Sequence, residues 1–214
     1  MITLDHLVLA AHTLEQGMAY VDNVLGAQPM GGGQHVAIGT HNRVLRLGER
    51  QYLEVIAIDP NGVQPALPRW FNLDDPALQA QLRLRPRLIT WVARSNALRI
   101  DSAQLLVPVD IRPMSRGDLS WQFSFTADGG LIGEGLIPHL IEWDNPGHHP
   151  ADDLTDTGLR LVGLRGFHSA PESISNTIKA LGLAQQFVVR RTSPLQEAGL
   201  QAMIQTPRDV VILE

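Results

Sequence analysis

The sequence of 214 residues contains no cysteine, which excludes disulfide bonds, thiolate metal sites and cysteine nucleophiles. No apolar run approaches the ~20 residues that a helix needs to cross a bilayer. The first residues, from Met1 to His6, also lack the basic and apolar regions of a signal peptide. Together these absences predict a cytoplasmic protein that does not associate with a membrane.

Positive charge is scarce as well. The chain has 17 Lys and Arg residues against 22 Asp and Glu residues, a formal net charge of -5, and no basic run, so nucleic acid is not an expected partner. No Gly-x-Ser-x-Gly motif is present, and the triple glycine at residues 31–33 lacks the strand-to-helix context of a phosphate-binding loop. Hydrophobic residues make up 44% of the chain, which is ordinary for a folded protein.

One carboxylate, Glu54, interrupts a short apolar run over residues 51–60 that ends in Asp-Pro and is typical of a buried strand. An unpaired buried carboxylate is costly, so Glu54 requires a cation, a metal or several hydrogen-bond donors. A related run covers residues 136–146. When the aspartates that end the two runs are aligned, His139 falls opposite Glu54, so a residue able to bind metal recurs at the same depth of two similar strands.

The order strand, helix, strand, strand, strand recurs along the chain. It is predicted for residues 1–60 and 87–146, and as a partial or full third module for residues 157–214. A connector rich in Pro, Asn and Asp occupies residues 61–86. A repeat of about 60–70 residues fits a duplicated α+β module better than a solenoid. The sequence therefore predicts an α+β fold of repeated βαβββ modules.

Four stretches resemble the vicinal oxygen chelate superfamily and, within it, the glyoxalase-like proteins. They are residues 4–8, 39–42, 52–56 and 138–143. The resemblance implies the glyoxalase/bleomycin-resistance/dioxygenase-like arrangement, in which curved sheets surround a cavity. It also implies a divalent metal bound by side chains on the first and last strands of the modules. In this chain those positions are His6, Glu54, Thr90 and His139.

Threonine is a poor metal ligand, so Thr90 departs from the family pattern and is interpreted as a substrate-binding residue. His6, Glu54 and His139 remain as the expected metal ligands. Two imidazoles and one carboxylate suit non-haem iron, and also zinc, manganese or nickel. Each residue has a structural alternative. His6 could be a hydrogen-bonded core histidine, Glu54 could pair with an arginine of the neighbouring strand, and His139 could face solvent.

The remaining candidates come from the neighbourhood of these strands. His41 and Asn42 either form a turn or face the cavity, and His35 could point into the same space. Glu142 lies three residues beyond His139 and therefore on the opposite face of a regular strand. We interpret His41 and Glu142 as candidate catalytic residues, and His35 and Asn42 as candidate substrate-binding residues.

The sequence therefore predicts a glyoxalase-like, metal-dependent enzyme of the lyase, isomerase or dioxygenase type, acting on a small oxygen-rich molecule. The alternative is a metal-free protein of the same fold that binds or sequesters a small molecule. A homodimer is compatible with either function.

Overall fold

The computed structural model describes residues 1–193 and 197–214. Residues 1–58 have the predicted strand, helix, strand, strand, strand order, with a helix capped by the Thr13 hydroxyl and ended by Gly26. The elements are β1 (Thr3–Ala10), α1 (Leu14–Leu25), β2 (Met30–His35), β3 (Thr40–Gly48) and β4 (Gln51–Ile58).

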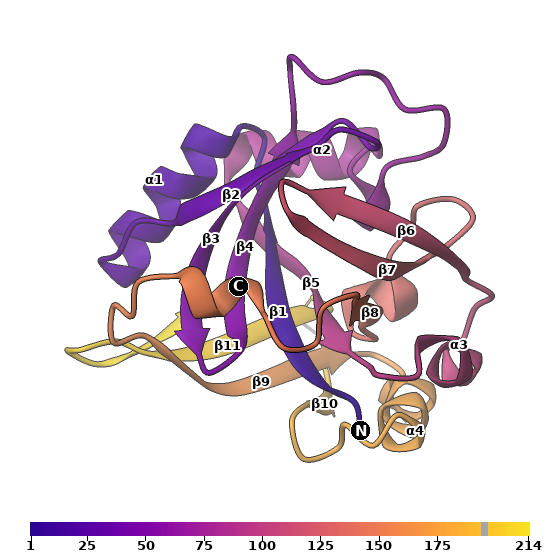
Figure 1. Ribbon diagram of the computed structural model, residues 1–214. Coiled ribbons are helices and arrows are strands. Elements are labelled where there is room, and N and C mark those ends of the chain that lie inside the picture. Colours follow the sequence, from indigo (N-terminus) through magenta and orange to yellow (C-terminus); the bar gives the residue numbers. More distant parts are fainter. Residues whose placement is uncertain (194–196) are drawn as a thin grey trace.

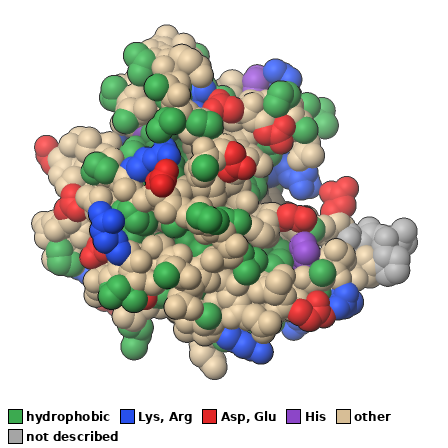
Figure 2. Space-filling view, turned by 90° about the vertical axis from the view of Figure 1, so that its right-hand side faces the viewer, with side chains coloured by type: hydrophobic (Ala, Val, Ile, Leu, Met, Phe, Trp, Pro, Cys, Tyr) green, Lys and Arg blue, Asp and Glu red, His purple; other side chains and the backbone are tan. Residues whose placement is uncertain are grey.

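The second stretch repeats this order with a shorter helix. Its elements are β5 (Arg87–Arg94), α3 (Leu98–Asp101), β6 (Asp110–Arg116), β7 (Leu119–Phe125) and β8 (His139–Trp143). The connector between the two stretches contains a 3-10 turn at Trp70–Asn72 and α2 (Pro76–Leu84). A loop of this connector projects at the top of the molecule (Figure 1), and hydrophobic side chains are exposed on it (Figure 2); Val63 and Leu67 are among them.

The two stretches form one curled sheet of eight strands in the order β2-β3-β4-β1-β5-β8-β7-β6 (Figure 1). Within each half the first strand lies parallel to the last, β1 to β4 and β5 to β8, and the halves join where β1 runs antiparallel to β5. The prediction of an α+β fold with duplicated βαβββ units and a curved sheet is therefore confirmed. Edge strands β2 and β6 approach each other, since a Cβ on Gly33 would lie 3.2 Å from Arg116 Cγ.

Alternating side chains give the large sheet two apolar faces. Leu7 and Leu9 of β1 point to the outer face, whereas Val8 and Ala10 point to the concave face. The outer face packs against α1 and the C-terminal stretch, and the concave face is filled largely by aromatic side chains. The four central strands β1, β4, β5 and β8 therefore present one side of every strand to a common interior.

The C-terminal stretch forms a second sheet behind the first. Its elements are β9 (Arg160–His168), α4 (Pro171–Ala180), β10 (Val188–Arg191), β11 (Gly199–Gln205) and β12 (Val210–Leu213). The order of elements matches that of the first two stretches, but the strand order is β10-β9-β11-β12, with β9 next to β10 and β11. No helix in the described part of the chain is long and apolar enough to span a membrane.

Candidate functional site

A β-bulge in β1 places two adjacent residues, Asp5 and His6, in direct contact. The pairing of β1 with β5 shifts between Leu4 and His6, so one residue of β1 is extra at this point. Oδ1 of Asp5 lies 2.7 Å from Nδ1 of His6, and both side chains are buried. The ring of His6 stacks on Tyr52 with centroids 4.5 Å apart. The imidazole is therefore fixed by a hydrogen bond at one nitrogen and by stacking on its face.

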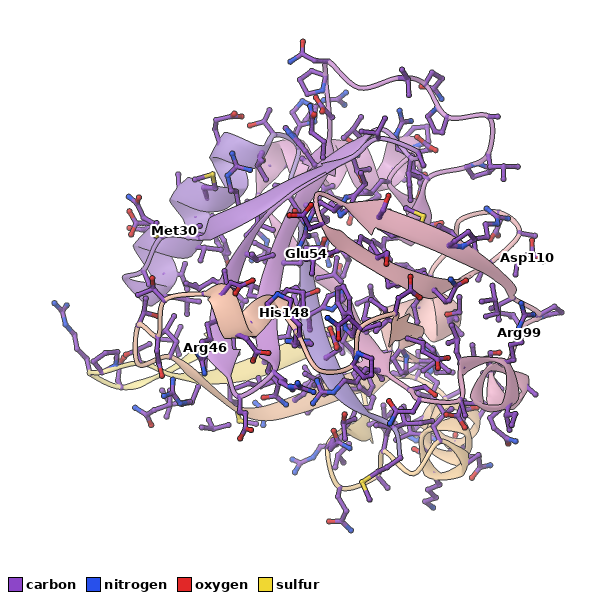
Figure 3. The ribbon with its side chains drawn as sticks, in the orientation of Figure 1. Met30, Arg46, Glu54, Arg99, Asp110 and His148 are labelled. Atoms are coloured by element: carbon purple, nitrogen blue, oxygen red, sulfur yellow. The ribbon has the colours of Figure 1, made fainter. Side chains whose placement is uncertain are left out.

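Glu54 approaches the other nitrogen of the same imidazole. Oε2 of Glu54 lies 3.7 Å from Nε2 of His6, and Oε1 accepts a hydrogen bond of 2.5 Å from the Asn42 amide. Parallel pairing brings β4 beside β1, and the two side chains share the concave face. Figure 3 shows Glu54 inside the curve of the large sheet. Asp5 thus holds Nδ1 of His6, and Asn42 holds Oε1 of Glu54. The remaining polar atoms, Nε2 of His6 and Oε2 of Glu54, face each other.

These two side chains line a small space, here named the inner pocket. Its cavity of about 10 Å³ has room for about one water molecule. The wall is largely aromatic, with polar groups from His6, His35, Glu54 and Arg116. Its other lining residues are Tyr52, Trp70, Phe71, Trp121, Phe123, Ile141 and Trp143.

His35 lies on the inner-pocket wall, as the sequence analysis proposed for it. Its Nδ1 is 3.0 Å from the Thr40 hydroxyl, and its ring meets the edge of Trp70 with centroids 4.9 Å apart. Burial, together with the positive charge of Arg116, holds the pKa of His35 well below its usual range. His35 is therefore neutral at physiological pH and can offer a lone pair or an N–H to a ligand.

The carboxylate of Asp5 has several donors besides His6. Oδ2 accepts hydrogen bonds of 3.0 Å from Trp143 Nε1 and from His149 Nε2, and Arg94 lies 3.5 Å away. Burial alone would raise the pKa of Asp5, but the hydrogen bonds from His149 and His6 outweigh it and hold the pKa well below its usual range. Asp5 is therefore an anion at all ordinary pH values.

His139 shares the concave face but not the inner-pocket wall. It and His6 both pair with Val92 of β5, so one strand separates them. Nδ1 of His139 donates to the Ser124 carbonyl at 2.9 Å, and its ring packs against Phe71 and Phe123. Nε2 is buried without a partner among the described residues. Burial lowers the pKa of His139 to about 4.

Three further residues expected at the site lie elsewhere. The Thr90 hydroxyl donates to the Gly135 carbonyl at 3.1 Å, which satisfies it inside the protein. Glu142 accepts from the backbone N–H of Leu98 at the start of α3, on the face of β8 opposite His139. His41 alternates with Asn42 along β3, so only Asn42 points to the concave face.

The residues present allow a direct test for a metal. Within residues 1–193 and 197–214, no three His, Asp or Glu side chains are close enough together to hold an ion. His6 and Glu54 nevertheless carry the support that metal ligands need, because Asp5 and Asn42 hold their second polar atoms. Two of the three expected ligands therefore fit a divalent ion, and the partnerless nitrogen of His139 is not placed to complete the set.

Asp5, Arg116 and His149 are the residues at the site that sequence reasoning missed. In a regular strand the side chains of Asp5 and His6 would point to opposite faces, and the bulge brings them together. Arg116 belongs to β6, on the far edge of the sheet from β2, and reaches the pocket because the sheet curls. The pair His148-His149 was the available signal, since it follows a cavity strand; the structure buries His149 and leaves His148 partly exposed.

The curled, duplicated sheet with its polar cluster on the concave face defines the class of the protein, the vicinal oxygen chelate fold. The sequence pattern of the glyoxalase-like domain matches residues 4–182, most of the chain. The chain therefore belongs to the glyoxalase-like domain family. No curated protein matches it.

Solved structures resemble the chain at low sequence identity, and one of them has a TM-score above 0.5. A hypothetical protein from Staphylococcus aureus is 13% identical, with a TM-score of 0.61 over 99% of this chain and 84% of its own. Methylmalonyl-CoA epimerase from Mycobacterium tuberculosis is 19% identical, with a TM-score of 0.40 over 65% of this chain and 86% of its own. A methylmalonyl-CoA epimerase in complex with methylmalonyl-CoA and NH4+ is 16% identical, with a TM-score of 0.43 over 69% and 97%.

Proposed function

We propose that the chain is a glyoxalase-like enzyme that transfers a proton on a small oxygen-rich molecule at the inner pocket, with a divalent metal ion as cofactor. The observation that carries this proposal is the approach of Nε2 of His6 to Oε2 of Glu54 at 3.7 Å. Both atoms face one pocket, while Asp5 and Asn42 hold the opposite ends of the two side chains. Such support orients ligands and bases in enzyme sites.

His6 and Glu54 are the residues that would hold the ion, and zinc, iron, manganese and nickel all accept imidazole and carboxylate ligands. When bound, the metal would polarise an oxygen atom of the substrate. Asp5 contributes by keeping the proton of His6 on Nδ1, which leaves the lone pair of Nε2 toward the pocket.

Glu54 would also move the proton: its Oε2 would exchange the ion for the proton of the substrate, while His6 keeps the ion. Its Oε2 is free of protein donors among the described residues and lies in the pocket. The positive charge of Arg116 on the same wall would balance negative charge that develops on the substrate. Proton removal and return at one carboxylate favour lyase or isomerase chemistry. A dioxygenase would need a third ligand, and His139 is not placed to supply it.

The second candidate is a metal-free protein that binds a small molecule. It is favoured by the absence of a three-ligand cluster from the part of the chain that the structure describes. In either case a substrate must displace part of the inner-pocket wall, because the cavity holds only about one water. Arg116, which packs on Gly33 where the sheet edges meet, belongs to the part of the wall nearest to these edges.

The two functions differ in metal binding. We expect isothermal titration with zinc and with ferrous iron to show binding to the wild type and at least about tenfold weaker binding to Glu54→Gln, which keeps the shape but removes the charge. Glu15→Gln, on the exposed surface of α1, is the matched control and should bind as the wild type does. Equal affinity in all three proteins, or no binding to any, would leave only the metal-free function.

A further inference from the structure

A second cavity lies beside the inner pocket, at the start of β1, the strand that carries Asp5. This outer cavity measures about 230 Å³ and is lined by the start of β1, the turn between β3 and β4, the ends of β5 and β8, and the loop that follows β8. Figure 3 shows His148 on this loop, in front of the large sheet and below Glu54. The outer cavity is much larger than the inner pocket, so it can accept a small molecule without rearrangement.

The charged side chains that line the outer cavity are positive. Its described lining includes Arg50, Arg94 and His148 but no carboxylate. The acidic groups nearest to these side chains lie beyond the lining: Asp5 is 3.5 Å from Arg94, Asp152 is 3.9 Å from Arg50, and Asp153 is 2.9 Å from His148. The pairs at Arg50 and His148 are partly solvent-exposed and compete weakly with a bound anion. Asp5 is buried, and its charge is shared among His6, Trp143 and His149 as well as Arg94. The cavity therefore favours a negatively charged ligand.

Arg94 is the best-oriented cation in the outer cavity. Its Nη1 donates to the carbonyl of Arg50 at 2.6 Å and to that of Leu4 at 3.3 Å, and lies 3.5 Å from Asp5. These contacts fix the plane of the guanidinium. Nε and Nη2 have no hydrogen-bond partner in the described part of the chain, and the side chain is 24% exposed. A planar donor group held in this way suits a carboxylate or a phosphate.

We propose that the outer cavity is a binding site for a small oxyanion, the carboxylate or phosphate group of a small organic molecule. Arg94 makes the main contact, Arg50 adds positive charge, and the Thr3 hydroxyl and the Asn96 amide supply neutral hydrogen bonds. Both neutral side chains line the cavity and have no side-chain hydrogen bond to another described residue.

The outer cavity is separate from the inner pocket. Trp143 lines both, and its Nε1 donates to Asp5, so the indole forms the wall between them. His149 closes the same wall from the loop side by its hydrogen bond to Asp5. An oxyanion in the outer cavity therefore binds without contacting Glu54, and its binding is independent of the proposed metal.

Isothermal titration of the full chain with inorganic phosphate, and separately with malonate, at constant ionic strength tests the site. We expect both probes to bind, and the tighter one identifies the source of the oxyanion. Arg94→Lys keeps the positive charge but loses the planar set of guanidinium donors, so its affinity for the probes should fall about tenfold or more. Asn96→Ala changes an exposed side chain outside the buried cluster and should cost a few-fold in affinity.

Two controls locate the binding. Arg208→Gln removes one positive charge from an exposed position with no side-chain partner among the described residues, and should bind both probes as the wild type does. Glu54→Gln should also bind them normally, whether or not it has lost metal. The proposal is overturned if neither probe binds, if Arg208→Gln weakens binding as much as Arg94→Lys, or if Glu54→Gln abolishes it.

Discussion

Asp5 decides which protons its neighbouring imidazoles carry. Nδ1 of His149 accepts from the backbone N–H of Ala151 at 3.2 Å, so the proton of a neutral His149 is on Nε2 and points at Asp5. The Nδ1 proton of His6 also points at Asp5. One buried anion thus holds two imidazoles in defined tautomers, and for His6 this leaves Nε2 available toward Glu54.

His139 predicts how stability depends on pH. Its pKa is about 4 in the folded protein and 6.5 in the unfolded chain, because burial disfavours the charged ring. Below pH 6.5 the unfolded state takes up a proton that the folded state refuses. The free energy of unfolding should therefore fall by up to about 3 kcal/mol as the pH drops from 6.5 to 4. Urea unfolding across this range measures the fall.

A variant at the same position separates this effect from other acid effects. His139→Phe keeps an aromatic ring between Phe71 and Phe123 but cannot titrate, so its stability should change less between pH 6.5 and 4 than that of the wild type. His35 retains a share of the pH dependence, since its pKa is lowered too. His12→Phe, at an exposed position, should follow the wild-type curve. Parallel curves for wild type and His139→Phe would contradict the explanation.

For single residues, the sequence was informative where side chains alternate regularly along a strand. His6 and Glu54 were identified as polar residues in apolar strands, and His35 from its position after the flexible glycines; the structure brings all three to one pocket. His41 was expected beside Asn42, but alternation along β3 separates the two. Asp5 could not be found, because the bulge that turns it toward His6 arises from pairing with β5, which no local pattern reveals.

Among the elements, β2 is an irregular edge strand of the large sheet. Its glycines lie at the edge, where the pairing with β3 shifts between Met30 and Gly33. Gly32 has a φ of 85°, and a Cβ on it would lie 2.3 Å from the carbonyl oxygen of Asn42. Gly33 accordingly donates its N–H to the Asn42 side chain at 3.0 Å. The close approach of β2 therefore positions the amide that holds Glu54.

Gly32→Ala should disturb this strand through two separate effects. The methyl group adds a backbone clash to the strain of a positive φ, which by itself costs about 1–2 kcal/mol. Gly117→Ala is the matched control, because Gly117 has a φ of 56° but open space around its Cβ position. Urea unfolding should show a larger loss of stability for Gly32→Ala. Equal losses would show that β2 moves freely away from β3.

The elements were predictable to the extent that their patterns are local. Turn residues and apolar periodicity located the strands of the duplicated units. Thr13 and Gly26 marked the start and the end of α1. The helix expected after the first strand of residues 87–146 is reduced to α3 and a 3-10 turn, since its residues bury little apart from Leu98 and Leu105. Strand order in the C-terminal sheet depends on long-range pairing, which element order alone does not determine.

For the molecule as a whole, the C-terminal sheet completes the hydrophobic core of the large one. Buried residues of both sheets form a single cluster on the outer face, in which Phe187 packs on Trp91 with ring centroids 5.0 Å apart. Removing the second sheet would expose the outer faces of the central strands to water. We therefore expect the chain to unfold as one cooperative unit.

Phe187→Ala tests this cooperativity from the C-terminal side. Deleting a buried phenylalanine typically costs about 3–5 kcal/mol. All four tryptophans precede residue 144, so their fluorescence reports on the large sheet and its connector, whereas far-UV circular dichroism reports on the whole chain. If the sheets unfold together, both signals should shift by the same amount in urea. Phe167→Ala, a half-buried residue of the same small sheet, should cost less. A fluorescence transition that stays at its wild-type midpoint while the dichroism signal shifts would show that the two sheets unfold independently.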